Sequence, residues 1–196
     1  MNEQFLKMIK TRRVIRHMTG QSVEREKIEK ILEAGRWTPA AGNQRTTRFV
    51  VIQDPLTLDL VRCFSPGMFQ QPNVIILLCI DWDIVEENQF ATSDKSPYID
   101  LGVVKQTMML AAHAQGLGSG PVTSFSKEAI RMILNIPSNL TPEVEVCIGY
   151  AAPKGKSQLP MRVKSIVSWE DLTFWERFDT LKDAKETLNG KVLESN

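Results

Sequence analysis

Three arginines near the start of the chain have the residue type and the spacing to bind an anion. Arg12, Arg13 and Arg16 lie within five residues, after a segment, Glu3–Ile9, that predicts a short helix. A guanidinium group is a planar fork of donors that fits a phosphate group and keeps its charge. A solvated helix end would use the same residues, because cations also suit a helix C-terminus. For this segment alone, both interpretations remain open.

The composition of the chain favours a local anion site over general attraction to a polyanion. The 196 residues contain 24 Lys and Arg against 23 Asp and Glu, which gives a formal net charge of +1. A tight cationic cluster in an otherwise neutral chain indicates a small anionic ligand. We therefore expect no nucleic-acid partner.

Length and hydropathy predict one globular domain, with or without a tail. The hydrophobic content is 42%, which is ordinary for such a domain. The longest apolar run, Val74–Ile80, is strand-sized and falls far short of the ~20 residues that span a bilayer. Met1–Lys10 carries charges and lacks the apolar centre of a signal peptide. We expect a cytoplasmic protein without a membrane partner.

Cysteine and histidine are too few and too dispersed to predict a metal or dithiol site. Cys63, Cys79 and Cys147 are far apart and form no C-x-x-C pair, and there are only two histidines. This spacing matches neither zinc motifs nor dithiol redox motifs. We expect buried, reduced thiols and no metal ligand.

The apolar pattern predicts a sheet with helices packed on it. Strand-like and helix-like segments do not alternate regularly, so the pattern predicts the α+β class. Ser22, Asp54 and Ser126 stand where N-caps of helices are expected. The expected helices are residues 3–9, 22–36, a helix from 55, 97–116 and 126–134, and the expected strands are residues 48–53, 74–81, 121–125 and 144–150, with 116–120 as the loop that ends the long helix.

Two apolar segments need more covering than a small core provides. Pro97–Gly116 is apolar on most sides of its predicted helix, so we expect it to be buried in a core or between subunits. Trp169–Phe178 is rich in large aromatic residues and needs a surface to cover. A partner subunit is the natural candidate. The predicted organisation is a main domain, residues 1–168, and an amphipathic C-terminal extension, residues 169–196.

Four segments, in the right order and spacing, resemble the FMN-dependent nitroreductase family. One such motif alone would be weak evidence, but together they cover the chain from Ile9 to about Trp175. They are Arg12–Arg16, similar to the family's R-R-S-x-R phosphate motif; Trp37–Asn43 with Arg48–Val51, similar to its A-P-S-x-x-N loop and the following strand; Asp100–Ser119, similar to its long central helix and G-L-G-S ending; and Gly120–Phe125, similar to its strand along the flavin ring.

The resemblance implies a nitroreductase-like central sheet, mostly antiparallel and flanked by helices, in a homodimer with FMN at the interface. The C-terminal tail would embrace the partner subunit. The implied FMN contacts are Arg12, Arg13, Val14, Arg16, Pro39, Ala40, Ala41, Gly42, Asn43, Gln106, Pro121, Val122, Thr123 and Ser124, with the basic pair Arg162 and Lys164 as later phosphate contacts. No catalytic side chain is expected, because FMN itself performs the redox chemistry.

The chemistry of the residues supports some of these implied FMN contacts more than others. The side-chain amide of Asn43 suits the flavin edge or its ribityl hydroxyls, although Asn43 also fits a simple turn after Gly42. Backbone N–H groups within Pro121–Ser124 would stabilise charge on the reduced ring. Gln106 either reaches the flavin or satisfies buried backbone groups. Arg162 and Lys164 either contact phosphate or belong to a solvated loop.

The chain departs from the family pattern at several of these positions. Val14 replaces the serine of the first motif, and Ala40 and Ala41 replace the serines of the loop. Gln44–Thr47 stands where the family has x-Q-P-W, at the mouth of the active site. Thr123 stands where some relatives have a glutamate. The substrate class therefore does not follow from the resemblance.

The activity implied by the resemblance is reduction of FMN by NADH or NADPH, followed by ping-pong transfer to a small-molecule acceptor such as a nitroaromatic or a quinone. The alternative enzyme is a specialised relative, for example a flavin-destroying or dehalogenating oxidoreductase. Its specialisation would be found in Gln44–Thr47 and in Trp82–Ser96. A non-catalytic flavin-binding protein and a nucleic-acid-binding protein are the rival classes.

Overall fold

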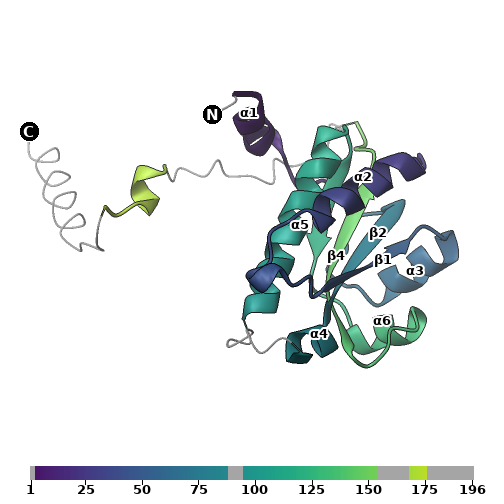
Figure 1. The fold of residues 1–196 in the computed structure, drawn as a ribbon. Coiled ribbons are helices and arrows are strands. Elements are labelled where there is room, and N and C mark those ends of the chain that lie inside the picture. Colours follow the sequence, from purple (N-terminus) through teal and green to yellow (C-terminus); the bar gives the residue numbers. More distant parts are fainter. Residues whose placement is uncertain (1–2, 88–94, 154–167, 176–196) are drawn as a thin grey trace, which may run out of the picture. The chain divides into compact units, whose positions relative to one another are not determined.

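The computed structural model describes residues 3–87, 95–153 and 168–175 (Figure 1). The chain divides into two units, Met1–Pro153 and Lys154–Asn196. The second unit contains one described element, the short 3-10 helix η2 (Glu170–Leu172). The first unit contains every strand of the described chain and is the subject of the following paragraphs.

A four-stranded antiparallel sheet forms the centre of the first unit. The strands are β1 (Thr47–Ile52), β2 (Val74–Asp81), β3 (Gly118–Val122) and β4 (Leu140–Gly149), in the spatial order β1-β2-β4-β3. All three strand pairs are antiparallel. Every residue of β2 is buried, as its unbroken apolar run predicts for a central strand. The predicted α+β class with a mostly antiparallel sheet is confirmed.

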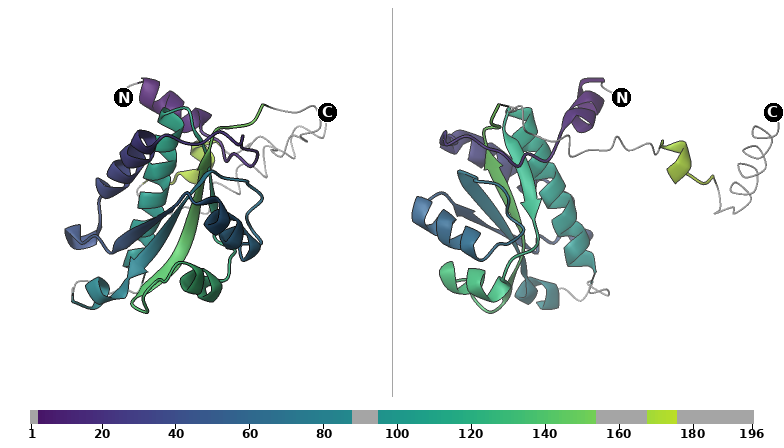
Figure 2. Two further views of the ribbon diagram at one scale, coloured as in Figure 1. Left: turned by 90° about the vertical axis from the view of Figure 1, so that its right-hand side faces the viewer. Right: turned by 180° about the vertical axis from the view of Figure 1, so that it is seen from behind.

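Helices cover both faces of this sheet (Figure 2). The helices of the first unit are α1 (Glu3–Thr11), which contacts α5, and α2 (Arg25–Arg36), α3 (Pro55–Cys63), α4 (Trp82–Glu87), α5 (Ser96–Ala114) and α6 (Lys127–Ile133). One core cluster joins α2 and α5 to the sheet, and a second joins α3 and α6 to the opposite face. Alternate residues of β2 enter the two clusters: Ile76 and Leu78 face α5, whereas Ile75 and Leu77 face α3 and α6.

Two of the three predicted helix caps are confirmed. The Asp54 carboxylate accepts a hydrogen bond from the Thr57 N–H at 2.8 Å, and the Ser126 hydroxyl accepts one from the Ala129 N–H at 3.3 Å. The prediction that Ser22 caps the next helix is wrong. Within the described chain α2 has Glu24 at its N-cap position, with no side-chain cap bond. Val23 is buried in the core and sets where the chain turns into the helix.

The predicted strand 121–125 lies three residues too late. β3 begins at Gly118 and ends at Val122, so the G-L-G-S-G segment that was expected to be a loop contains the start of the strand. Leu140–Gly149 begins four residues earlier than expected, with an irregularity opposite Leu78 and Cys79 that accommodates Pro142. Among the cysteines, Cys79 and Cys147 are buried as expected, but Cys63 is exposed at the end of α3.

A stretch of irregular chain, which we call the strap (residues 12–19), lies against β3 and the end of β4. Val14 forms a parallel bridge with Ser119, and the Ile15 N–H donates to the Ser119 carbonyl at 2.9 Å. Farther along, the Thr19 N–H donates to the Tyr150 carbonyl at 2.8 Å. The strap therefore fixes the arginines that follow α1 relative to the sheet.

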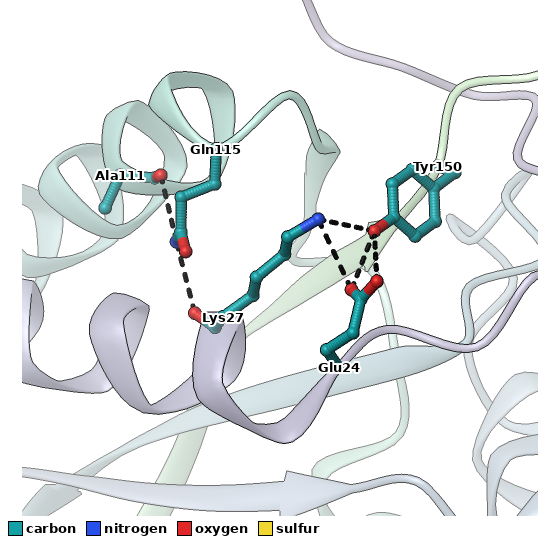
Figure 3. A network of polar contacts seen from close by, with 5 residues as sticks. All are labelled: Glu24, Lys27, Ala111, Gln115 and Tyr150. Atoms are coloured by element: carbon teal, nitrogen blue, oxygen red, sulfur yellow. Dashed lines mark hydrogen bonds and ion pairs between the residues drawn. The ribbon is translucent and has the colours of Figure 1, made fainter.

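A polar network surrounds Tyr150, the residue whose carbonyl accepts the hydrogen bond from Thr19 of the strap (Figure 3). Lys27 Nζ donates to the Tyr150 hydroxyl at 2.6 Å, and that hydroxyl donates to Glu24 Oε2 at 2.7 Å. The hydrogen bond from Tyr150 lowers the pKa of Glu24, and Lys27 adds to this effect. Gln115 Nε2 donates to the Lys27 carbonyl at 3.1 Å. The network thereby joins the start of α2, the end of α5 and the end of β4.

We predict that Gly118→Ala displaces the strap. A Cβ at Gly118 would lie 2.9 Å from each of three Ile15 side-chain atoms, a separation that requires the strap to move. The free energy of unfolding should fall by about 1–3 kcal/mol, as for other overpacked sites, and urea denaturation measures it. Gly20→Ala is the matched control, because a Cβ there meets no described atom within 4 Å. Equal stability of the two variants would contradict this packing.

Candidate functional site

Arg12 is the member of the arginine cluster whose surroundings point most directly to an anion. Its side chain is half-buried on the strap. The nitrogen Nη1 is buried and has no hydrogen-bond partner among the described residues. A buried guanidinium nitrogen without a partner is unfavourable, and a charged ligand oxygen would satisfy it. This arrangement fits the phosphate-binding role that the sequence predicted.

The other members of the first motif are placed differently. Arg13 Nη1 donates to the backbone carbonyls of Lys10 and Arg12, so this guanidinium is used at the end of α1. Arg16 is exposed on the strap. Val14 is 42% exposed and pairs through its backbone with β3. The three guanidinium groups therefore do not have equivalent positions, which their spacing alone could not reveal.

The end of β3 supplies the second part of the predicted site. Val122 is buried and pairs with Glu145 of β4, whereas Thr123 and Ser124 follow the strand and are exposed. Pro121 lacks an N–H group, so it cannot be one of the expected backbone donors. The Ser124 carbonyl accepts a hydrogen bond from the Gly67 N–H at 3.1 Å. This bond fixes the chain where the sequence predicted the reactive edge of the flavin.

The loop that contains Pro39 and Ala40 forms the third part. It leads into η1 (Ala41–Asn43), in which Gly42 and Asn43 both have positive φ, 59° and 57°. Gly42 adopts this conformation without strain, and asparagine tolerates it better than most residues. The Asp100 carboxylate at the start of α5 accepts a hydrogen bond from the Ala41 N–H at 3.0 Å. The loop is thus attached to one end of α5.

Arg45 organises the same loop, and sequence reasoning did not single it out. Its Nη1 donates to Asn43 Oδ1 at 2.9 Å, and its Nε donates to the Arg36 carbonyl at 3.1 Å. Because Arg45 takes the amide oxygen, Asn43 offers its amide nitrogen as a donor. The residues Gln44–Thr47 and Arg48 line a pocket beside this loop, together with Ala40 and Asp100. The altered segment Gln44–Thr47 thus lines a pocket, and its role at the mouth of an active site stays a prediction.

The structure places the strap and the Asn43 loop at opposite ends of α5. At one end, Thr11 Oγ1 lies 3.0 Å from His113 Nε2, directly before the arginine cluster. At the other end, Asp100 holds Ala41. His113 follows Asp100 by 13 positions, which corresponds to a rise of about 20 Å along a helix. Within one chain, the strap and the Asn43 loop are therefore too far apart to contact the same end of a ligand.

Gln106 lies midway along α5 and is half-buried. It shares a helix face with Ile99 and Val103, whose side chains are 64% and 38% exposed. The opposite face packs against the core through Val104 and Met108. The expectation that the helix is apolar on most sides is met, and part of this apolar surface faces outward in the described chain.

Arg162 and Lys164 lie outside the described residues. Across the described residues, no group of three or more His, Cys, Asp and Glu side chains is arranged to hold a metal ion. Within the same residues, no helix has both the length and the apolar composition to cross a membrane.

Comparison with known proteins agrees with the fold and the motif positions. The nitroreductase family model matches residues 9–61 and 57–150. A curated relative from Archaeoglobus fulgidus, described as an NADH dehydrogenase/NAD(P)H nitroreductase, is 32% identical over 158 residues, which cover 76% of this chain and 86% of the relative.

Solved structures give the same result. A nitroreductase family protein from Clostridium difficile 630 has a TM-score of 0.75 and 29% identity, covering 91% of this chain and 100% of the other. An FMN-dependent nitroreductase from Clostridium difficile R20291 has a TM-score of 0.70 and 26% identity, covering 88% and 99%. The agreement of motifs, fold and relatives leads to one conclusion: the chain belongs to the nitroreductase family.

Proposed function

We propose that this chain is an FMN-dependent NAD(P)H oxidoreductase that reduces small-molecule acceptors such as nitroaromatics or quinones. Membership of the family supports the cofactor and the reductant. The structural observation that carries the proposal is the buried Arg12 Nη1, which no described residue satisfies, beside the strand β3. An FMN phosphate supplies the missing acceptor oxygens.

The described residues fit FMN in a consistent way. Arg12 and the exposed Arg16 would hold the phosphate at the strap, and the backbone of Thr123 and Ser124 would approach the isoalloxazine ring. When bound, FMN supplies the hydride-transfer chemistry. The chain's task is to bind and orient it: Gly67 fixes Ser124 through a backbone hydrogen bond, and Asp100 fixes the Asn43 loop.

A second copy of the chain would complete the site. The strap and the Asn43 loop lie at opposite ends of α5, so a loop from a partner subunit is the simplest way to bring both to one flavin. The exposed Ile99 and Val103 give α5 an apolar surface for such a partner. In the C-terminal unit, Trp169 and Trp175 are 63% and 69% exposed, which is consistent with a tail that covers another surface. We therefore propose a homodimer with FMN at its interface.

The acceptor depends on the pocket beside the Asn43 loop. We propose that NADH or NADPH reduces FMN and leaves before the acceptor enters, in ping-pong order. Because the altered residues Gln44–Thr47 line the pocket, a specialised oxidoreductase is the second candidate. A yellow protein whose colour is bleached by NADH or NADPH under anaerobic conditions supports either enzyme. A yellow protein that neither nucleotide bleaches would indicate a non-catalytic flavin-binding protein.

We expect Arg12→Ala to weaken FMN binding without unfolding the protein. Loss of a charge-assisted phosphate contact should lower the affinity roughly ten- to a hundredfold, which a flavin fluorescence titration measures. Arg25→Ala is the control, because Arg25 is an exposed arginine paired with Glu29 on α2. If both variants bind FMN as the wild type does, Arg12 is not a phosphate ligand.

The contact between Asp100 and the Asn43 loop should also influence FMN affinity. Asp100→Ala removes the acceptor for the Ala41 N–H and should weaken FMN binding by about fivefold to tenfold, the usual range for one lost hydrogen bond. Asp100→Asn keeps a side-chain oxygen that can accept the bond, so it should bind FMN more tightly than the alanine variant. Equal affinities in the two variants would mean that this hydrogen bond does not position the loop for FMN.

The proposed dimer predicts a specific effect of charge on α5. Stable interfaces of this kind bury roughly 2,000–5,000 Å² and resemble a protein core. Val103→Glu should therefore yield monomers in sedimentation velocity and reduce the FMN content. Leu56→Glu is the control, because Leu56 is 75% exposed on α3 and lies away from the proposed interface. A folded wild-type monomer loaded with FMN at low micromolar concentration would contradict the dimer.

A further inference from the structure

Glu145 of β4 is a fully buried carboxyl group that the proposed reaction does not use. The residue is 0% exposed. Its neighbours across the sheet are Leu77 on β2 and Val122 on β3. Cys147, two residues along the same strand, belongs to the core cluster beneath α3 and α6. Side chains two residues apart lie on the same face of a strand, so Glu145 also faces that core.

The Ser65 hydroxyl lies between two groups that can accept its proton. Ser65 Oγ lies 2.8 Å from the Val61 carbonyl and 2.8 Å from Glu145 Oε1. The hydroxyl has one proton, and the carbonyl of Val61 can only accept it. An ionised carboxylate would compete with Val61 for this single proton, whereas a protonated carboxyl group can donate to Ser65 and leave the bond to Val61 intact. The arrangement therefore favours the neutral form of Glu145.

The surroundings of the second oxygen agree with a neutral acid. Oε2 is buried and has no hydrogen-bond partner within the described residues. An ionised carboxylate in such a place would be strongly unfavourable, whereas a neutral acid is tolerated. Burial raises the pKa of Glu145 from 4.5 to about 7, although a hydrogen bond donated by Ser65 to the ionised form would lower it.

The charged and ionisable neighbours do not provide a partner for an ionised Glu145. On β4, Glu143 is paired with Lys127 of α6 at 2.7 Å. Cys147 on β4 has a raised pKa because of burial and the nearby Glu145. Arg62 of α3 opposes this rise in the pKa of Cys147. Its Nη1 pairs with Asp59 on the same helix at 3.3 Å, and its buried Nε has no hydrogen-bond partner within the described residues, Glu145 included. The residues of β2 and β3 that pair with Glu145 are Leu77 and Val122, and both are apolar.

Glu145 is connected to the proposed flavin-binding segment by a short chain of contacts. Ser65 belongs to the segment that follows α3, and in this segment the Gly67 N–H donates to the Ser124 carbonyl at 3.1 Å. The Ser126 N–H donates to the Phe64 carbonyl at 2.9 Å, so residues 64–67 and 124–126 are joined at both ends. A Cβ at Gly67 would lie only 2.8 Å from the Ser124 Cβ, which shows how closely the segments pack.

We propose that Glu145 is a positioning residue that acts as a neutral acid: its hydrogen bond to Ser65 seats residues 64–67 against Ser124, and its ionisation loosens this contact and weakens FMN binding. The first half stands on the geometry of the chain itself. The second half rests on the proposed function, because it places Ser124 at the flavin.

The first test measures amide hydrogen exchange of the Gly67 N–H in the protein without FMN, from pH 6 to pH 9. If only the neutral form holds the contact, the protection factor should fall by up to about tenfold per pH unit above the midpoint of the titration. The Thr57 N–H, held by the Asp54 cap, is the reference amide for the pH dependence of exchange itself. Glu145→Gln should abolish the fall, because its amide group can donate to Ser65 without ionising.

The same variants test stability and FMN binding. Because the pKa of Glu145 is raised in the folded protein, the contribution of Glu145 to the free energy of unfolding should be fully present below pH 4.5. This contribution should decline as the pH rises through about 7. Glu145→Gln should lack this decline. The FMN dissociation constant of the wild type should rise over the same pH range as Gly67 protection falls, relative to that of Glu145→Gln.

The outcomes separate the two proposals. Identical Gly67 exchange profiles in the wild type and Glu145→Gln would overturn the positioning role. If Gly67 exchange depends on pH as expected in the two proteins but FMN binds at no pH, the proposed function is overturned and the positioning role stays intact. Should Glu145→Gln fail to fold, Ser65→Ala serves instead: it removes the acceptor, so the Gly67 protection should be low at every pH. Normal protection in Ser65→Ala would also overturn the proposal.

Discussion

The arrangement of the site depends on the pairing of the strap with the edge of β3. The hydrogen bond from the Ile15 N–H to the Ser119 carbonyl is possible because Gly118 and Gly120 have no side chains, so Ile15 and Val14 can approach the strand closely. Arg12 lies two residues before this pairing, and its Nη1 is buried without a partner in the described chain. The network of Tyr150, Lys27 and Glu24 then holds the far end of the strap (Figure 3).

The sequence predicted those features that local chemistry determines. The buried run of β2, the caps at Asp54 and Ser126 and the long apolar helix were all correct, because each depends on residues near one another in the chain. The start of β3 was misplaced because glycine and serine have low strand propensity. Gly118–Gly120 is a strand because β4 and the strap pair with it, and a single sequence gives no direct sign of either partner.

Parts of the candidate site could be predicted as residue types but not as positions. The motif at Arg12–Arg16 predicted three similar guanidinium groups for one anion, yet Arg13 turns back onto the backbone carbonyls of Lys10 and Arg12 at the end of α1. Asp100 and Arg45 were quoted only as parts of motifs, although they hold the Asn43 loop. Alternation of Val144, Glu145 and Val146 is typical of a strand with one solvated face. Helices cover both faces of this sheet, so Glu145 is buried instead (Figure 2).

Among the buried side-chain atoms that lack partners in the described chain are Arg12 Nη1 and Glu145 Oε2, which belong to segments that pair with β3: Arg12 to the strap and Glu145 to the neighbouring strand β4. Their chemistry requires opposite solutions. A guanidinium keeps its proton, so under the proposed function an anionic ligand would satisfy Arg12. A carboxyl group can bind a proton, so burial favours the neutral form of Glu145 without any ligand. This edge of the sheet would thus combine a position suited to a charged cofactor with one that disfavours charge.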